Sequence, residues 1–368
     1  MSREAKAALY REWGGPIRVE TIHVAPPKRN EITIKLTACG VCHSDLSAAT
    51  GKIPYPAPLV LGHEGAGVVV EVGEGVAGFS AGDHVVSTFI SMCGKCRQCV
   101  RGRPVLCENA GKAMVNLPDG TVRTTDSEGK DLNVFGACGV MAEYATLHVD
   151  NAVRIEQGVS LQNAALVGCA VMTGVGAVFN TAELEPGSRA AIFGVGGVGL
   201  NAIQGCQTAG AEMIVAVDTN GSKLETAREF GATHTININE VEDAAKAVKK
   251  LTGGVDYAFE CVGVGTVVAQ AYKCLGKGGT AVVVGVADPK DETTIGTLAL
   301  PSEERSLKGS WLGSARPQYD FPRILALYKA GKLKLDELVT RTYTIEEAAE
   351  AFEDMKAGKN ARGVIVFD

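Results

Sequence analysis

The sequence has no excess of positive charge, no long hydrophobic run and no secretory leader pattern. The formal net charge is -6 at pH 7, which argues against nucleic acid or an anionic membrane as the main partner. No apolar run reaches the roughly 18 residues that cross a bilayer, so we expect no membrane partner. The first residues lack the apolar core of a signal peptide, so we expect a cytoplasmic protein.

The chain also lacks the even cysteine framework of a small secreted scaffold. It has 11 cysteines, an odd number, among 368 residues, so metal or redox chemistry is a better explanation than disulfides. No Gly/Ser linker and no internal repeat is visible. The length predicts two domains, and the 46% hydrophobic and 21% charged residues are ordinary for a globular protein.

The two halves of the chain show different hydrophobic patterns. Alternation at 31–37, 65–72 and 83–88 predicts the strands of an antiparallel, barrel-like module. Residues 112–135 are polar and rich in turns, and we expect them to form an exposed excursion near the mouth of the site.

From roughly residue 160, short apolar runs alternate with helical segments, which is typical of βαβ units and a parallel sheet. These patterns predict an α/β protein. The predicted strands are 190–193, 213–217, 257–259 and 280–284, followed by helices at 321–330 and 345–357 and a last strand at 363–367.

A glycine-rich loop, Gly-Val-Gly-Gly-Val-Gly at 194–199, lies between a predicted strand and a predicted helix. Glycines there allow backbone N–H groups to approach a pyrophosphate at a helix N-terminus. Asp218 ends the next strand, where it would accept hydrogen bonds from a ribose and repel a 2′-phosphate, so NAD is favoured over NADP. Lys223 could also reach the ribose. The alternative is a glycine turn in an ordinary α/β domain. The predicted contacts in the loop are Gly194, Gly196, Gly197, Val198 and Gly199.

Four cysteines, Cys93, Cys96, Cys99 and Cys107, stand within fifteen residues. Four thiolates close a tetrahedron around one Zn²⁺ and leave no position for a substrate, so this site is predicted to be structural. An iron–sulfur centre or unmetallated thiols are the alternatives.

A second set of soft ligands, Cys42, His63 and Cys169, lies outside this cluster. Three protein ligands leave a fourth position open, as in a catalytic zinc site. Asp45 would hold the second nitrogen of the histidine, and Glu64 would lie beside the metal or occasionally bind it. Taken singly, a buried cysteine is more often a small hydrophobic residue and a lone histidine a core residue.

Together these motifs resemble the zinc-containing medium-chain dehydrogenases, specifically the alcohol dehydrogenases that carry two zinc ions. The resemblance covers essentially the whole chain, including 62–68, the four-cysteine lobe and the loop at 194. It implies a GroES-like, β-rich catalytic domain at 1–170 that contains the structural-zinc lobe (93–107), a Rossmann domain at 171–312 that binds NAD, and a return to the catalytic domain at 313–368.

The resemblance also implies roles for single residues. Cys42, His63 and Cys169 hold the catalytic zinc, and Ser44 begins a proton relay. Many relatives with this relay have a histidine where this chain has Ser47, so the proton would leave by way of the cofactor ribose and His43, or directly to water. The remaining implied contacts are His43 and Arg362 at the pyrophosphate, Thr173 near the nicotinamide, and Phe89, Val134, Phe135 and Trp311 at the substrate.

The implied activity is reversible hydride transfer between NAD and a primary alcohol, or a secondary or aromatic one, giving an aldehyde or ketone. A polyol or glutathione-adduct dehydrogenase is the alternative within the superfamily. A zinc-ribbon binding module and a crystallin-like protein that only binds dinucleotide are the rivals from other classes. The family also suggests a homodimer or homotetramer, joined by strand addition near 282–301.

Overall fold

The computed structural model describes residues 1–110 and 114–368, which form two compact units. The first unit is Met1–Cys169, Arg316–Ala330 and Leu335–Asp368, and the second is Ala170–Ala315 and Gly331–Lys334. The short return at 331–334 joins the second unit because Lys334 donates its backbone N–H to Gln204 (2.8 Å), and Thr208 donates to the Lys332 carbonyl (3.0 Å).

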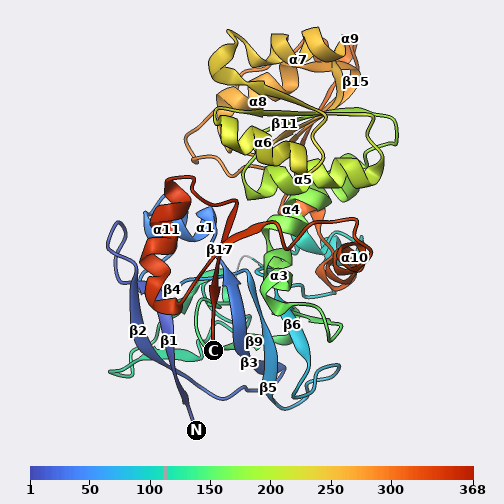
Figure 1. The fold of residues 1–368 in the computed structure, drawn as a ribbon. Helices are drawn as coiled ribbons and strands as arrows, with labels where there is room; N and C mark the ends of the chain where they lie inside the picture. The colour runs from blue at the N-terminus through green and yellow to red at the C-terminus, as the bar shows by residue number, and fades with distance from the viewer. Residues whose placement is uncertain (111–113) are drawn as a thin grey trace. The chain divides into compact units, whose positions relative to one another are not determined.

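Two sheets built mainly from antiparallel strands make up the β-rich part of the first unit (Figure 1). One has the order β7-β2-β1-β4-β8: β1 (Arg3–Tyr10), β2 (Arg18–Val24), β4 (Leu59–Val60), β7 (Thr124–Asp126) and β8 (Asn133–Val134). The other has the order β10-β6-β5-β3-β18-β17, with β9 also on β3: β3 (Glu31–Gly40), β5 (Gly65–Val72), β6 (His84–Ser87), β9 (Tyr144–His148), β10 (Ala152–Ile155), β17 (Val339–Tyr343) and β18 (Arg362–Val366).

Strand β3 is more central than its alternating sequence predicts. It pairs with β5, β9 and β18, so Ile32, Ile34 and Leu36 are at most 1% exposed and even Thr33 is buried. The helices of this unit are α1 (His43–Ala49), α2 (Arg97–Val100), α3 (Leu161–Ala165), α10 (Pro317–Lys329) and α11 (Ala348–Lys356), with shorter turns at Pro104–Leu106, Phe135–Ala137, Val149–Asn151, Leu166–Gly168 and Ile345–Glu347.

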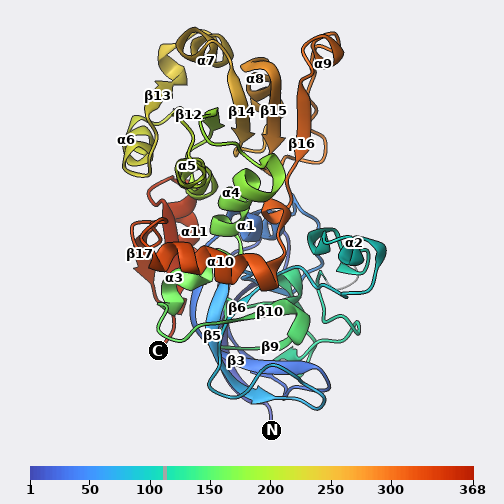
Figure 2. The same cartoon turned by 90° about the vertical axis from the view of Figure 1, so that its right-hand side faces the viewer.

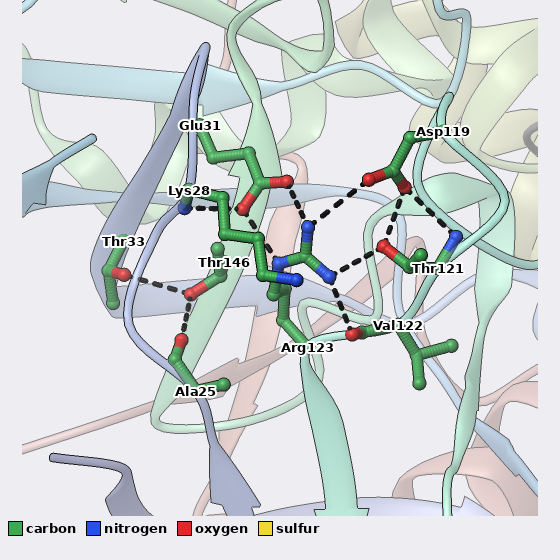
Figure 3. A network of polar contacts seen from close by, with 9 residues as sticks. All are labelled: Ala25, Lys28, Glu31, Thr33, Asp119, Thr121, Val122, Arg123 and Thr146. Atoms are coloured by element: carbon green, nitrogen blue, oxygen red, sulfur yellow. Dashed lines mark hydrogen bonds and ion pairs between the residues drawn. The ribbon is translucent and has the colours of Figure 1, made fainter. Parts of the chain in front are cut away.

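A buried ion pair fixes part of the predicted excursion at 112–135 to the start of β3 (Figure 3). The Arg123 guanidinium donates to both carboxylate oxygens of Glu31, at 2.8 and 2.6 Å, and also to Thr121 and Asp119. Both members of the pair are at most 5% exposed. The excursion therefore includes a short hairpin, closed by the pairing of Thr125 with Asp131 and attached to β3 through Arg123. Its residues 112–113 lie outside the described part of the chain.

The second unit is a six-stranded parallel sheet with the order β13-β12-β11-β14-β15-β16 (Figure 2). Helices α5 and α6 cover one face, and α7 and α8 cover the other (Figure 1). The strands are β11 (Arg189–Phe193), β12 (Met213–Asp218), β13 (His234–Asn237), β14 (Val255–Glu260), β15 (Leu275–Val283) and β16 (Ser306–Gly309). The helices are α4 (Ala170–Gly176), α5 (Gly197–Ala209), α6 (Gly221–Glu229), α7 (Ala244–Thr252), α8 (Gly265–Lys273) and α9 (Ala299–Ser302), with shorter turns at Ala177–Ala182, Ile238–Glu240 and Leu312–Ser314.

The predicted α/β fold class is confirmed by this doubly covered parallel sheet beside a β-rich unit. No single helix among the described residues is long and apolar enough to cross a membrane. One bent pair, Leu161–Gly168 with Ala170–Ala182, passes by length and composition alone, and its residues are mostly buried.

Candidate active site and metal centres

Four potential metal ligands converge in the first unit. Cys42 immediately precedes α1, His63 follows β4, and Cys169 follows the turn Leu166–Gly168. One ligand atom from each of them, and a carboxylate oxygen of Glu64, all lie within 4.8 Å of one another. Each of the four side chains is at most 9% exposed. The fold therefore brings the predicted catalytic-zinc ligands into one buried cluster.

The donor set of this cluster fits zinc. Thiolates and a neutral imidazole are ligands that Zn²⁺ prefers. His63 Nε2 is buried, and apart from the neighbouring Cys42 thiol it has no hydrogen-bond partner among residues 1–110 and 114–368. Contact with the Cys169 sulfur is the largest cause that holds the pKa of the Cys42 thiol well below its ordinary value. A thiol that ionises readily binds a metal more readily. Cys42, His63 and Cys169 would thus hold one ion and leave a fourth position open.

Asp45 lies behind the histidine, as the sequence suggests. Its carboxylate is 3.2 Å from His63 Nδ1 and 0% exposed, and it accepts the Gly62 backbone N–H at 2.8 Å. Burial acts to lower the pKa of His63, but the charge of Asp45 and its contact with the imidazole outweigh burial and raise that pKa. With a metal bound, the same carboxylate would hold the proton on Nδ1 and leave Nε2 free as the ligand.

Asp45→Asn is expected to weaken zinc binding at this centre by about 10–100-fold, because the partner that orients His63 loses its charge. Zinc retention during titration with a chelator measures the effect. Asp126→Asn is the matched control, since Asp126 is also a buried acid that accepts backbone N–H groups, from Glu128 and Lys130. Equal zinc retention by the two variants would contradict a supporting role for Asp45.

Glu64 forms a buried ion pair with Arg362, which begins β18. Burial raises the pKa of Glu64 to about 7, while the charge of Arg362 opposes the rise. The second carboxylate oxygen of Glu64 is buried and has no hydrogen-bond partner in the described part of the chain. Arg362 is only 7% exposed, and its guanidinium binds the Glu64 carboxylate. Its contact with a cofactor pyrophosphate stays a prediction.

The predicted relay residues lie on helix α1. Ser44 Oγ is 3.6 Å from Cys42 Sγ, which places the hydroxyl directly beside the metal cluster. His43 is exposed and Ser47 is half-buried. The structure thus places Ser44 where it could accept a proton from a group bound near the metal, whereas the path beyond Ser44 stays a prediction.

Aromatic rings surround the histidine of the cluster. The rings of Phe89 and Phe135 meet His63 edge to face, with centroid distances of 5.4 and 5.1 Å. Tyr55, which the sequence analysis missed, meets Phe135 in the same way at 4.8 Å, and its carbonyl accepts the Trp13 indole N–H at 2.6 Å. No local motif marks Tyr55, so only the fold identifies it. Val134 is 7% exposed, and Trp311, which belongs to the second unit, is 44% exposed.

The four clustered cysteines also have the geometry of a metal centre. Their sulfur atoms lie within 4.8 Å of one another, and Cys96 and Cys107 are 3.9 Å apart. Two sulfurs bound to one tetrahedral zinc are expected about 3.8 Å apart, given Zn–S bonds of roughly 2.3 Å. The backbone N–H of Lys95 is the largest cause that lowers the pKa of Cys93 to about 6. The residues present therefore fit a closed, structural zinc site.

The glycine loop lies between β11 and α5 in the second unit, as predicted. A Cβ atom on Gly199 would lie 1.9 Å from the Gly194 carbonyl oxygen, so the tight turn requires glycine, whereas the space beside Gly196 is open. Gly197 and Val198 begin α5, and their N–H groups belong to the first turn of a helix, where anions bind. The loop thus has the form of a dinucleotide cradle.

Asp218 ends β12 beside this loop. Its carboxylate accepts the Val195 backbone N–H at 2.8 Å and the Asn220 backbone N–H at 2.9 Å. Lys223 is half-buried on the first turn of α6. Thr173, in α4, is 9% exposed. The geometry places Asp218 at the loop, and the cofactor contacts of Asp218, Lys223 and Thr173 stay predictions.

Known families and structures match both units. The family model for the alcohol dehydrogenase GroES-like domain matches residues 28–157, and the family model for zinc-binding dehydrogenases matches residues 197–330. The NDMA-dependent alcohol dehydrogenase of Amycolatopsis methanolica is 40% identical over 99% of this chain and 99% of its own length.

Two solved structures are similar over nearly the full chain. Benzyl alcohol dehydrogenase from Acinetobacter calcoaceticus is 32% identical, with a TM-score of 0.92 and complete coverage of both chains. A zinc-binding dehydrogenase from Sinorhizobium meliloti, solved with NADP, is 25% identical with a TM-score of 0.83, covering 99% of this chain and 100% of its own.

These matches confirm the resemblance drawn from the motifs. They cover the β-rich unit with its metal ligands and the parallel sheet with its glycine loop. The chain therefore belongs to the zinc-dependent alcohol dehydrogenase family of the medium-chain dehydrogenases and reductases.

Proposed function

We propose that this protein is an NAD-dependent alcohol dehydrogenase that converts a primary alcohol and NAD reversibly into an aldehyde, NADH and a proton. Aromatic and secondary alcohols are included in the proposal. The observation that carries it is the convergence of Cys42, His63 and Cys169 in one buried cluster, in a chain that also contains a dinucleotide cradle. A second zinc bound by Cys93, Cys96, Cys99 and Cys107 would be structural.

When bound, zinc supplies a Lewis acid and NAD supplies a hydride acceptor. The protein contributes position and electrostatics. Asp45 fixes the histidine in one orientation, and Ser44 stands 3.6 Å from the Cys42 sulfur, where its hydroxyl would accept a hydrogen bond from the alcohol and pass the proton outward toward solvent. The rings of Phe89 and Phe135 beside His63 would restrict water at this site and favour an apolar substituent on the alcohol.

The choice of NAD rests on Asp218, whose negative charge lies beside the loop that would bind the cofactor. A 2′-phosphate near this carboxylate would be repelled. One relative is named NDMA-dependent and one similar structure is bound to NADP, so the acceptor must be tested directly. NAD, NADP and NDMA therefore all belong in the first assay.

Asp218→Ser is expected to raise the ratio of kcat/KM for NADP to kcat/KM for NAD at least about tenfold, because one like-charge repulsion is removed. Steady-state rates with both cofactors give the ratio. Asp243→Ser is the control: Asp243 is also an acid of the second unit, and it caps α7 through the Lys246 backbone N–H at 2.8 Å. An unchanged ratio for the Asp218 variant would exclude this residue as the discriminator.

The activity is tested on purified protein of known zinc content with primary, secondary and aromatic alcohols. Alcohol-dependent NADH formation supports the full proposal. Turnover with NADP or NDMA but not with NAD would overturn the choice of NAD as the acceptor, while the proposed alcohol dehydrogenase activity would stand. Absence of turnover with every alcohol and acceptor in a protein that holds two zinc ions would refute the alcohol dehydrogenase activity.

We also propose a homodimer or homotetramer. The support is the edge of the parallel sheet, which is β16 at Ser306–Gly309 rather than a strand within the expected range 282–301. Among the described residues β16 pairs with β15 on one side only, and its Leu307 is 37% exposed. An open strand edge is a site where another strand can pair. The mass in solution, measured by light scattering, tests this proposal, and a monomer would refute it.

A further inference from the structure

Glu260, the last residue of β14, is a buried acid at the centre of the carboxyl edge of the parallel sheet. It lies in register with Phe193 of β11 and Val283 of β15, and it is 0% exposed. The strand order reverses between β11 and β14, since the chain continues from β11 to β12 and β13 before it returns. Open α/β sheets bind dinucleotides in the crevice outside such a reversal point.

The carboxyl group of Glu260 organises the turn that follows β14. Its Oε1 accepts the backbone N–H groups of Val262 and Gly263, each at 2.7 Å. Its main-chain carbonyl accepts the N–H groups of Val284 and Gly285, at 2.9 and 3.0 Å. This one residue therefore ties the turn at 261–263 to the end of β15.

The same turn is packed tightly between the nucleotide loop and β15. A Cβ atom on Gly194 would lie 2.5 Å from Val262 Cγ2, and a Cβ atom on Gly285 would lie 2.1 Å from the Gly263 nitrogen. Neither glycine has room for a Cβ atom, so the turn lies in close contact with both the nucleotide loop and the end of β15.

The carboxyl group of Glu260 is not explained by sheet stability. Its second oxygen, Oε2, is buried with no hydrogen-bond partner among the described residues. Burial is the largest cause that raises the pKa of Glu260, and the backbone N–H groups of Gly263, Val262, Val264 and Gly285 oppose the rise. A buried oxygen without a partner disfavours folding. We therefore look for the role of the Glu260 carboxylate in the turn at 261–263, which it holds through two hydrogen bonds.

The position of the turn also indicates which half of a dinucleotide it would meet. Asp218 on β12 would take the adenosine ribose, so β14 and β15 remain for the nicotinamide half. Val262 and Val286, at the ends of these strands, are 50% and 49% exposed. They offer apolar surface, which suits the face of an aromatic ring.

We propose that Glu260 is a positioning residue for the nicotinamide half of the cofactor: it holds the turn at 261–263 so that Val262 and the nucleotide loop stay in the arrangement that binds the dinucleotide. The inference rests on the proposed use of a nicotinamide cofactor. It assigns no proton transfer to Glu260, which acts through the turn.

The test is the dissociation constant for NADH, measured by fluorescence titration on zinc-loaded protein. Glu260→Gln keeps the size of the side chain but removes the charge that strengthens the hydrogen bonds from the Val262 and Gly263 N–H groups, so at least about a tenfold rise in the dissociation constant is expected. The KM for NAD should rise by a similar factor while kcat changes little. Asp256→Asn is the matched control at the other end of β14, where the Asp256 carboxylate accepts the Arg189 backbone N–H at 2.8 Å. This control should lower the melting temperature without changing NADH affinity.

Unchanged NADH affinity in Glu260→Gln, or an equal loss in Asp256→Asn, would overturn the inference. If Glu260→Gln does not fold, Val262→Ala tests the inference in its place. The Val262 side chain is half exposed, so this variant should fold. Its affinity for NADH should fall at least about threefold, because apolar surface beside the cofactor is lost. Unchanged affinity in that variant would then refute the inference. Wild-type protein that binds neither NADH nor NADPH would refute the proposed function instead.

Discussion

Cys42→Ala should abolish alcohol turnover, with a loss in kcat of at least about a thousandfold, and leave the fold intact. The variant removes one of three ligands from a buried cluster whose ligand atoms lie within 4.8 Å of one another. Metal Lewis acids contribute several kcal/mol to such reactions, and about 4 kcal/mol corresponds to a thousandfold. The zinc content should fall from two to one per chain, because the four clustered cysteines are untouched.

Cys39→Ala is the control for that experiment. Cys39 is a buried thiol three positions earlier on β3, its sulfur contacts the Gly40 carbonyl at 3.6 Å, and it is not one of the four clustered ligands. It should retain both zinc ions and most of its activity. Retention of more than about a tenth of the wild-type rate by Cys42→Ala, in protein of measured metal content, would refute the catalytic zinc assignment.

The second large effect is expected at the other cluster. Cys93→Ala should release the structural zinc and lower the melting temperature by about 10 °C, which corresponds to roughly 4 kcal/mol for a domain of this size. The four cysteines organise the lobe around α2 and the turn Pro104–Leu106, where few side chains are buried. Calorimetry with zinc analysis measures both changes.

The control for the structural site is Lys95→Ala. Lys95 contributes a backbone N–H to the Cys93 sulfur, and its exposed side chain is not a ligand. This variant should keep both zinc ions and the wild-type melting temperature. A Cys93→Ala protein that melts with the wild type while holding one zinc would contradict a structural role. The Cys93→Ala variant should lose turnover only to the extent that it unfolds, so at temperatures below its melting transition its activity should match that of the wild type.

Local patterns predicted much of the fold. The strand, loop and helix around 194–199 follow from a short apolar run, close glycines and a helical segment, all adjacent in the chain, and β11 and α5 lie there. The four cysteines are likewise so close in sequence that their meeting needs little from the rest of the fold. In the second unit, strands β13 and β16 and helix α9 were missed, because segments of only four residues carry no clear period.

Other features depend on segments far apart in the chain. Arg362 and Glu64 are 298 positions apart, and the pairing of β3 with both β18 and β5 brings them together. Tyr55 reaches Phe135 because the chain before β4 lies against the one after β8. No spacing rule predicts such contacts, since they depend on sheet order and side-chain packing rather than on neighbours.

The sequence by itself determined the α/β class, the four-cysteine cluster and the nucleotide loop, because residue type at short spacing is enough to specify each of them. The family and the second ligand set, Cys42, His63 and Cys169, were indicated only by the combination of these motifs. The tertiary structure decided which of those residues share one buried cluster, which rings stand against His63, and how Glu260 ties the ends of two strands to the loop at Gly194. The physical reason is that burial and contact between distant segments exist only once the sheets have paired.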